Sequence, residues 1–109
     1  LAQELSAAAA AAGERVWRMP LIDDYRDSLD SDIADLRNIG DPAKHYSGGS
    51  ITAALFLQEF LRGGRTGTVP WAHLDVAGPA RADADEDEVT KGATGFGVRT
   101  FLRWLESLS

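Results

Sequence analysis

Two polar side chains on one predicted strand are the first candidates for chemistry in this chain. His73 and Asp75 stand two residues apart, and alternate residues of a strand face the same side of a sheet. An imidazole and a carboxylate placed in this way could be two ligands of one metal ion. A zinc or dinuclear site needs at least three ligands, and no third is evident nearby, since His45 falls in a separate loop. The alternative is that both side chains hydrogen-bond to neighbouring loops.

A glycine-rich turn is the second candidate. Ser47, Gly48, Gly49 and Ser50 precede an apolar helical stretch, and bare glycine amides at a helix N-terminus attract anions such as phosphate. The turn lacks the spacing and the lysine of a P-loop. The same glycines could instead let a buried helix start against closely packed neighbours. The sequence alone leaves both alternatives open.

The remaining charged groups favour a structural interpretation. Five acidic residues crowd into residues 83–88 without the spacing or the glycine of a calcium-binding EF-hand loop. Packed like charges are typical of a solvated, mobile loop. Lys44, Lys91 and Arg99 could each bind a carboxylate, although a surface charge is the simpler interpretation. No G-x-S-x-G nucleophile motif occurs. We therefore assign no catalytic and no metal-binding residue from residue chemistry.

Composition excludes several classes of function. The net charge of -6 argues against nucleic acid as the main partner, because phosphate binding needs a basic surface. The absence of cysteine excludes disulfides and thiolate zinc sites. No apolar run approaches the ~18 residues of a membrane span, and the N-terminus does not resemble a signal peptide. We expect a cytoplasmic protein without membrane partners. Because the chain opens on Leu1 inside a helical pattern, we also expect a fragment or a processed product.

Periodicity predicts a central helix within residues 45–61, after the glycine-rich turn. Its apolar residues recur at helical spacing on two faces, so we expect neighbours to cover it on most sides. Ser47 or Ser50 should cap it, and Gly63 and Gly64 should end it.

Three other helices complete the helical prediction. One covers residues 1–12, contributes little apolar surface and stops at Gly13; another covers residues 23–29 and is capped by Asp23. The last is capped by Thr94 or a neighbouring residue and runs through Ser109. Its predicted buried face consists of Val98, Phe101, Leu102, Leu105 and Leu108.

Alternation predicts two strands. Residues 31–39 alternate weakly, and residues 69–78 alternate strongly, with Trp71, His73 and Asp75 on one side. Residues 14–21 should form a short extended segment. Strands separated by helices are typical of an α/β domain. We therefore predict an α/β layer architecture, and 109 residues are enough for one modest domain.

Five stretches together resemble a known family. They are VWRMPL, DSDIADLRNIG, GGSITAALFLQEF, WAHLDVAGPA and KGATGFGVRTFLRWL. Their order and spacing resemble the C-terminal part of the catalytic domain of the cytosol (leucyl) aminopeptidases, from about residue 14 to residue 105. The resemblance implies that residues 1–109 are the C-terminal segment of such a domain, with a partial mixed sheet flanked by helices. The resemblance implies an exopeptidase that removes N-terminal residues such as leucine from peptides. It also implies two divalent metal ions, manganese or zinc, that bridge a water molecule.

The resemblance also implies where the site residues lie. The family's NTDAEGR motif, which carries metal-binding carboxylates and the active-site arginine, is absent from this sequence. The other metal ligands of the family also lie upstream, so the resemblance does not assign His73, Asp75 or Asp35 as ligands. The segment alone should therefore be inactive. The loop before GATG and the helix after GGS would form a wall of the pocket for the substrate's N-terminal side chain. The substrate-binding residues implied in this way are Leu55, Thr90 and Ala93.

The family further implies partners and alternatives. We expect peptide substrates, a homo-hexamer of the full chain, and contact with the upstream part of the same catalytic domain. A non-catalytic structural or assembly element of the same fold is the main alternative. A small anion- or nucleotide-binding α/β module that uses the glycine turn is the third hypothesis. Finding NTDAEGR in a preceding stretch of chain would favour the enzyme.

Overall fold

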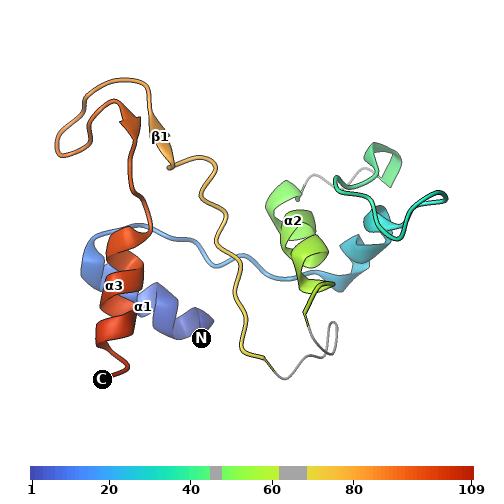
Figure 1. Cartoon of the computed structure of the whole chain (residues 1–109), viewed down its shortest axis with the longest axis horizontal. Helices are drawn as coiled ribbons and strands as arrows, with labels where there is room; N and C mark the ends of the chain where they lie inside the picture. The colour runs from blue at the N-terminus through green and yellow to red at the C-terminus, as the bar shows by residue number, and fades with distance from the viewer. Residues whose placement is uncertain (45–47, 62–68) are drawn as a thin grey trace. The chain divides into compact units, whose positions relative to one another are not determined.

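The structure is a computed structural model that describes residues 1–44, 48–61 and 69–109. The chain divides into two compact units (Figure 1). Unit 1 consists of Leu1–Arg18 together with Ala72–Ser109, and unit 2 consists of Met19–Trp71. Within the described ranges, every helix is too short or too polar to cross a lipid bilayer.

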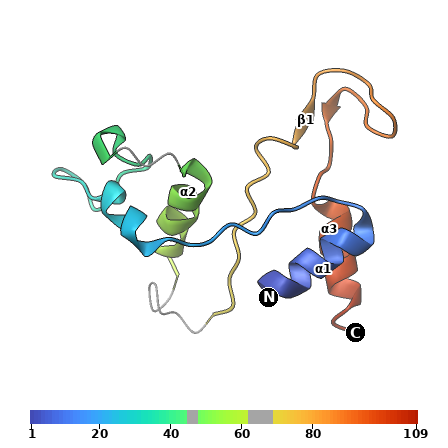
Figure 2. The same ribbon diagram turned by 180° about the vertical axis from the view of Figure 1, so that it is seen from behind.

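Unit 1 is built around two helices that lie side by side in both views (Figures 1 and 2). The helix α1 spans Ala2–Ala12, as its run of strong helix formers predicts. Gly13 ends it in the left-handed conformation, and the next amide donates back to the carbonyl of Ala9, which satisfies one of the orphan carbonyls. The prediction of this helix and its stop is confirmed. Its contribution to packing is larger than predicted, because Leu5, Ala8 and Ala9 are all buried.

The helix α3 spans Val98–Glu106, and its predicted buried face is wrong. The five apolar side chains of that face are between 43% and 66% exposed: Val98, Phe101, Leu102, Leu105 and Leu108. Thr100 is buried instead, and Trp104 donates from its indole nitrogen to Glu4 of α1 at 3.4 Å. Helical spacing identifies which side chains share a face, but it does not identify which face has a neighbour.

An acidic hairpin over residues 81–93 supplies the sheet of unit 1. Strand β1, Arg81–Ala82, pairs antiparallel with β2, Gly92–Ala93. Further along, Glu86 and Val89 exchange both backbone hydrogen bonds, and Asp87 between them has a φ of 51°. Aspartate tolerates this left-handed conformation at the tip of a two-residue turn. The acidic side chains of residues 83–88 are exposed, as predicted for a solvated loop.

The two strands predicted from alternation are wrong. Residues 31–39 and 69–78, all within the described ranges, form bends, turns or no regular structure. The first segment folds back locally, since Arg37 donates its amide to the carbonyl of Leu29 at 2.8 Å. A strand needs a partner for its backbone N–H and C=O groups, and alternation does not show that a partner is present. The α/β class holds, with its sheet reduced to the acidic hairpin in the described part of the chain.

Unit 2 has a small apolar core beneath a short helix. The helix α2 spans Gly49–Gln58, and the 3₁₀ helices η1 and η2 span Asp23–Leu29 and Pro42–Lys44. Leu29, Ile51 and Leu55 form the buried cluster. The helices predicted at residues 23–29 and after the glycine turn are therefore present, although α2 ends at Gln58, earlier than predicted. It is also less covered than predicted, because Leu57 and Phe60 are exposed.

The two glycines at the start of α2 differ in how closely their neighbours approach. A Cβ on Gly48 would lie 2.9 Å from Cε2 of Tyr25, whereas a Cβ on Gly49 would meet nothing within 4 Å. The close-packing explanation of the glycine turn therefore fits Gly48. Ser50 is not the cap, because it lies in the first turn of α2 and the N-cap position is Gly48. The other residues invoked there lie outside the described residues: His45, Ser47, Gly63 and Gly64.

Candidate functional site

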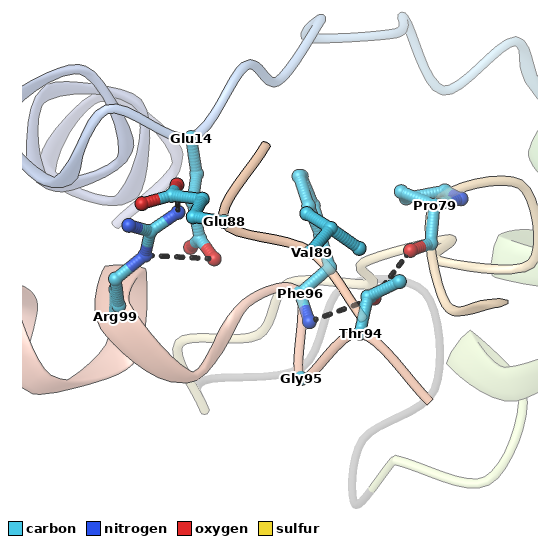
Figure 3. Close-up of a pocket in the computed structure, with 8 residues that line it drawn as sticks. All are labelled: Glu14, Pro79, Glu88, Val89, Thr94, Gly95, Phe96 and Arg99. Atoms are coloured by element: carbon cyan, nitrogen blue, oxygen red, sulfur yellow. Dashed lines mark hydrogen bonds and ion pairs between the residues drawn. The ribbon is translucent and has the colours of Figure 1, made fainter. Parts of the chain in front are cut away.

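A pocket of about 420 Å³ in unit 1 gathers residues from distant parts of the sequence (Figure 3). Its walls come from the segment after α1, from the acidic hairpin and its approach, from the loop between β2 and α3, and from α3 itself. The lining residues are Glu14, Pro79, Glu88, Val89, Thr94, Gly95, Phe96 and Arg99. We call this cavity the hairpin–helix pocket.

Glu14 is the buried carboxylate of this pocket. One oxygen accepts from the amide of Gly97 at 3.0 Å, and the other accepts from the amide of Thr100 at 2.9 Å and from the Thr100 hydroxyl. The first amides of a helix have no partner inside the helix, and a negative charge there also interacts favourably with the helix dipole. Glu14 therefore caps the N-terminus of α3 from 83 residues away in the sequence.

Thr94, the residue named first as a possible cap, does not cap α3. The Thr94 hydroxyl donates to the carbonyl of Pro79 and accepts from the amide of Phe96 at 3.2 Å (Figure 3). These bonds hold the loop that enters α3 against the start of the acidic hairpin. The residue before the helix is Gly97, with a φ of 94°, which has no side chain to cap with. A remote carboxylate fills the role that a local side chain usually has.

The pKa of the Glu14 carboxyl lies below its ordinary value. Burial opposes the charged form and acts in the upward direction. The hydrogen bond from the Thr100 hydroxyl, those from the amides of Gly97 and Thr100, and the positive charge of Arg99 together outweigh it. Glu14 is therefore ionised at neutral pH, as a charged cap requires.

Arg99 links two carboxylates at the rim of the pocket. Its Nη2 lies 3.0 Å from Oε1 of Glu88, and its Nε lies 3.8 Å from Oε1 of Glu14 (Figure 3). The arginine therefore joins the acidic hairpin to α3. Arg99 and Glu88 are both largely exposed, so solvent screens their attraction. Because two carboxylates surround one guanidinium, the rim of the pocket is not suited to binding an anion.

The structure separates the predicted substrate-binding residues between the two units. Thr90 and Ala93 are both exposed on the acidic hairpin, next to Val89 and Thr94 of the pocket lining. Leu55 lies in unit 2 and is 1% exposed in the core of that unit.

The residues weighed as metal ligands are not gathered into a cluster. Asp75 is exposed, and its Oδ1 accepts from the amide of Ala77 at 3.1 Å, which is a local turn contact. Asp35 is exposed in unit 2, and His73 lies in a segment of unit 1 without regular structure. Across residues 1–44, 48–61 and 69–109, no three histidine, aspartate or glutamate side chains come together as a metal site would require.

The interactions in the hairpin–helix pocket therefore serve to position segments of unit 1. Its hydrogen bonds hold the loop after β2, and with it Ala93, in one place relative to α3. Sequence analysis missed Glu14, and the only local signal was its position directly after the helix-stopping Gly13. Nothing in the sequence near Glu14 indicates a partner more than 80 residues away.

With this geometry in place, comparison with known proteins identifies the class. The chain belongs to the cytosol aminopeptidase family, since the sequence model of that family's catalytic domain matches residues 1–102. The resemblance inferred from the sequence motifs is thereby confirmed. The members of this family are peptidases.

Individual relatives agree with this assignment. A probable cytosol aminopeptidase of Synechococcus sp. (strain JA-3-3Ab) is 50% identical over 105 residues, which cover 96% of this chain and 19% of the relative. A probable cytosol aminopeptidase of Chlamydia felis is 50% identical over 106 residues, which cover 97% of this chain and 20% of the relative.

Solved structures match as well. The bottromycin maturation enzyme BotP in complex with Mn matches with a TM-score of 0.83 at 44% identity, over 98% of this chain and 22% of that one. A mutant of tomato leucine aminopeptidase matches with a TM-score of 0.77 at 43% identity. The match covers 95% of this chain and 18% of the tomato chain. The chain therefore spans about a fifth of the length of the relatives that it matches.

Proposed function

We propose that this chain is the C-terminal part of the catalytic domain of a metal-dependent aminopeptidase that removes N-terminal residues such as leucine from peptides. The observation that carries the proposal is the similarity of nearly the whole chain to BotP, a structure described as a complex with Mn. Family membership over residues 1–102 supports the peptidase activity of the longer protein.

The two divalent metal ions, manganese or zinc, belong to the longer protein in this proposal. The described residues do not fit a metal site, because no three potential ligands come together among them. The family resemblance implies that the ligands lie upstream of residues 1–109. Metal ions of this kind polarise the scissile carbonyl and activate water. The present segment would instead shape the substrate pocket.

Within that pocket, Thr90 and Ala93 are proposed to contact the substrate's N-terminal side chain. Both are exposed on the acidic hairpin, and the small side chain of Ala93 leaves room for a bulky group. Leu55 is proposed as a third pocket residue on the resemblance alone. Its burial in the core of unit 2 gives it a packing role as well, so substitution there would also lower stability.

The assembly and location form part of the same proposal. We propose a homo-hexamer of the longer protein, as the family resemblance implies. A cytoplasmic location is supported by the name of the relatives, cytosol aminopeptidases.

Hydrolysis of a leucyl-anilide tests the proposal. The longer protein that carries this segment should turn over the substrate when manganese is added and lose this activity when a chelator is added. The 109-residue chain alone should show no turnover. A folded, metal-supplemented longer protein without activity would favour the alternative of a non-catalytic structural element. Chelator-sensitive turnover by the 109-residue chain would place the metal ligands within this segment and overturn the proposal for upstream ligands.

A further inference from the structure

Ala93 lies in a loop whose backbone has little conformational preference of its own. Gly92 precedes it and Gly95 follows two residues later, with φ values of 113° and 68°. Positive φ values of this size favour glycine, and a Cβ on either residue would meet nothing within 4 Å, so close packing does not explain these glycines. Because glycine adopts many conformations, bonds made by neighbouring residues must hold Ala93 in place.

Thr94, the residue directly after Ala93, makes such bonds in two directions. Its hydroxyl donates to the carbonyl of Pro79, and its amide donates to the carbonyl of Ala80 at 3.0 Å. The same hydroxyl accepts from the amide of Phe96 at 3.2 Å (Figure 3). One half-buried side chain therefore connects the segment that enters the acidic hairpin to the loop that enters α3.

The other restraints on this loop act on Ala93 less directly. Strand β2 is only two residues long, and Ala93 at its end pairs with Arg81 of β1. Glu14 accepts from the amide of Gly97 at 3.0 Å and thereby holds the far end of the loop, at the start of α3. Thr94 is the residue next to Ala93 in the chain, so its hydroxyl has the most direct effect on where Ala93 lies.

We propose that the Thr94 hydroxyl is a positioning group for substrate selection: it holds Ala93 where a bulky N-terminal side chain of the substrate can contact it. This inference rests on the proposed function, in which Ala93 contacts that side chain. A leucine side chain extends further into such a pocket than an alanine methyl group, so movement of Ala93 weakens leucine substrates selectively. Thr94 acts through Ala93 and is therefore a positioning residue rather than a catalytic one.

Thr94→Val in the longer protein tests the proposal, because valine keeps nearly the same shape and lacks the hydroxyl. Hydrolysis of a leucyl-anilide and an alanyl-anilide is measured in parallel. KM for the leucine substrate should rise about threefold or more and KM for the alanine substrate should stay constant, since a side-chain contact contributes to binding before and during the reaction. A merely structural role would reduce the amount of folded enzyme and lower kcat for both substrates by the same factor.

Two further variants control for the loss of a hydroxyl. Thr94→Ser keeps the hydroxyl and should retain the wild-type ratio of the two KM values. Thr100→Val removes a buried hydroxyl of α3, while Glu14 still accepts from the amides of Gly97 and Thr100. It should lower the thermal unfolding midpoint at least as much as Thr94→Val does, yet leave the KM ratio unchanged. The ratio then reports on the loop and not on stability.

Amide hydrogen exchange of the same proteins measures the loop without reference to activity. Exchange at Phe96 should be about tenfold faster in Thr94→Val than in wild type or Thr94→Ser, because its amide loses its acceptor. Exchange at Gly97, which bonds to Glu14, should change less.

The outcomes separate this proposal from the proposed function. An active, chelator-sensitive wild type combined with equal effects of Thr94→Val on both substrates would overturn the role of Thr94 alone. Unchanged exchange at Phe96, or a shifted KM ratio in Thr94→Ser, would also overturn it. A folded, metal-supplemented wild type without turnover would overturn the proposed function, and substrate selection by Thr94 with it.

Discussion

A single carboxylate determines how α3 begins. Glu14 receives three hydrogen bonds from Gly97 and Thr100, although more than 80 residues separate it from both. It follows the stop of α1 directly, so one residue connects the end of the first helix to the start of the last. The loop that carries Ala93 into α3 depends on this contact for its position.

Glu14→Gln should destabilise unit 1 by about 1–3 kcal/mol at neutral pH, because an amide has one acceptor oxygen and leaves a buried donor unsatisfied. The lowered pKa of Glu14 sets the pH dependence. The carboxylate contributes its stability above the unfolded pKa, about 4.3, and loses it as pH falls through the lower folded pKa. Urea denaturation of the wild type and the variant should therefore differ at pH 7 and converge in acid.

Glu88→Gln is the matched control for that experiment. Glu88 shares Arg99 with Glu14 but is exposed, so its substitution should change stability by less than about 0.5 kcal/mol. Equal effects of the two variants, or a difference between wild type and Glu14→Gln that grows in acid, would contradict the capping role.

Ala93→Phe tests the pocket assignment in the longer protein. The large ring should fill space proposed for the substrate's side chain, so kcat/KM should fall more for leucine substrates than for alanine substrates. Ala84→Phe, the same change elsewhere on the acidic hairpin, should leave the ratio of the two substrates unchanged. An equal loss for both substrates in Ala93→Phe would argue against the assignment.

At the scale of elements, the start of α2 depends on close packing. Gly48 approaches the ring of Tyr25, which itself packs against the core of Leu29, Ile51 and Leu55. The φ of −87° at Gly48 is accessible to any residue, so the backbone conformation does not require glycine. Glycine is required because a Cβ at this position would lie too close to the ring of Tyr25.

Gly48→Ala should therefore lower the free energy of unfolding by about 1–3 kcal/mol through overpacking against Tyr25. Gly49→Ala is the paired variant, since its new methyl group would lie in open space at the first residue of α2. Alanine is the better helix former by up to about 1 kcal/mol, so this variant should be neutral or stabilising. Thermal unfolding of both variants measures the contrast, and similar effects at the two positions would refute it.

At the scale of the whole molecule, unit 1 is assembled from both parts of the sequence that flank unit 2. Residues 1–18 supply α1 and Glu14, while residues 72–109 supply the acidic hairpin and α3. The contacts that Glu14 makes in the hairpin–helix pocket therefore join residues that are distant in sequence. A chain without residues 1–14 would leave the first amides of α3 without their carboxylate, and Thr100 without its partner.

The sequence by itself determined the features that depend on short-range order. Alanine propensity and Gly13 defined α1, apolar periodicity located α2 and α3, and charge crowding identified an exposed acidic loop. Five short motifs in order were sufficient for the family, because a motif match needs no knowledge of contacts.

Only the tertiary structure decided which partners those elements meet. It showed that Glu14 caps α3, that Thr100 faces inward while Leu102 and Leu105 face outward, and that residues 69–78 form no strand. Each of these outcomes depends on a neighbour far away in the chain or on the presence of a pairing strand. Helical period and alternation describe the faces of a segment, whereas burial and pairing are properties of two segments together.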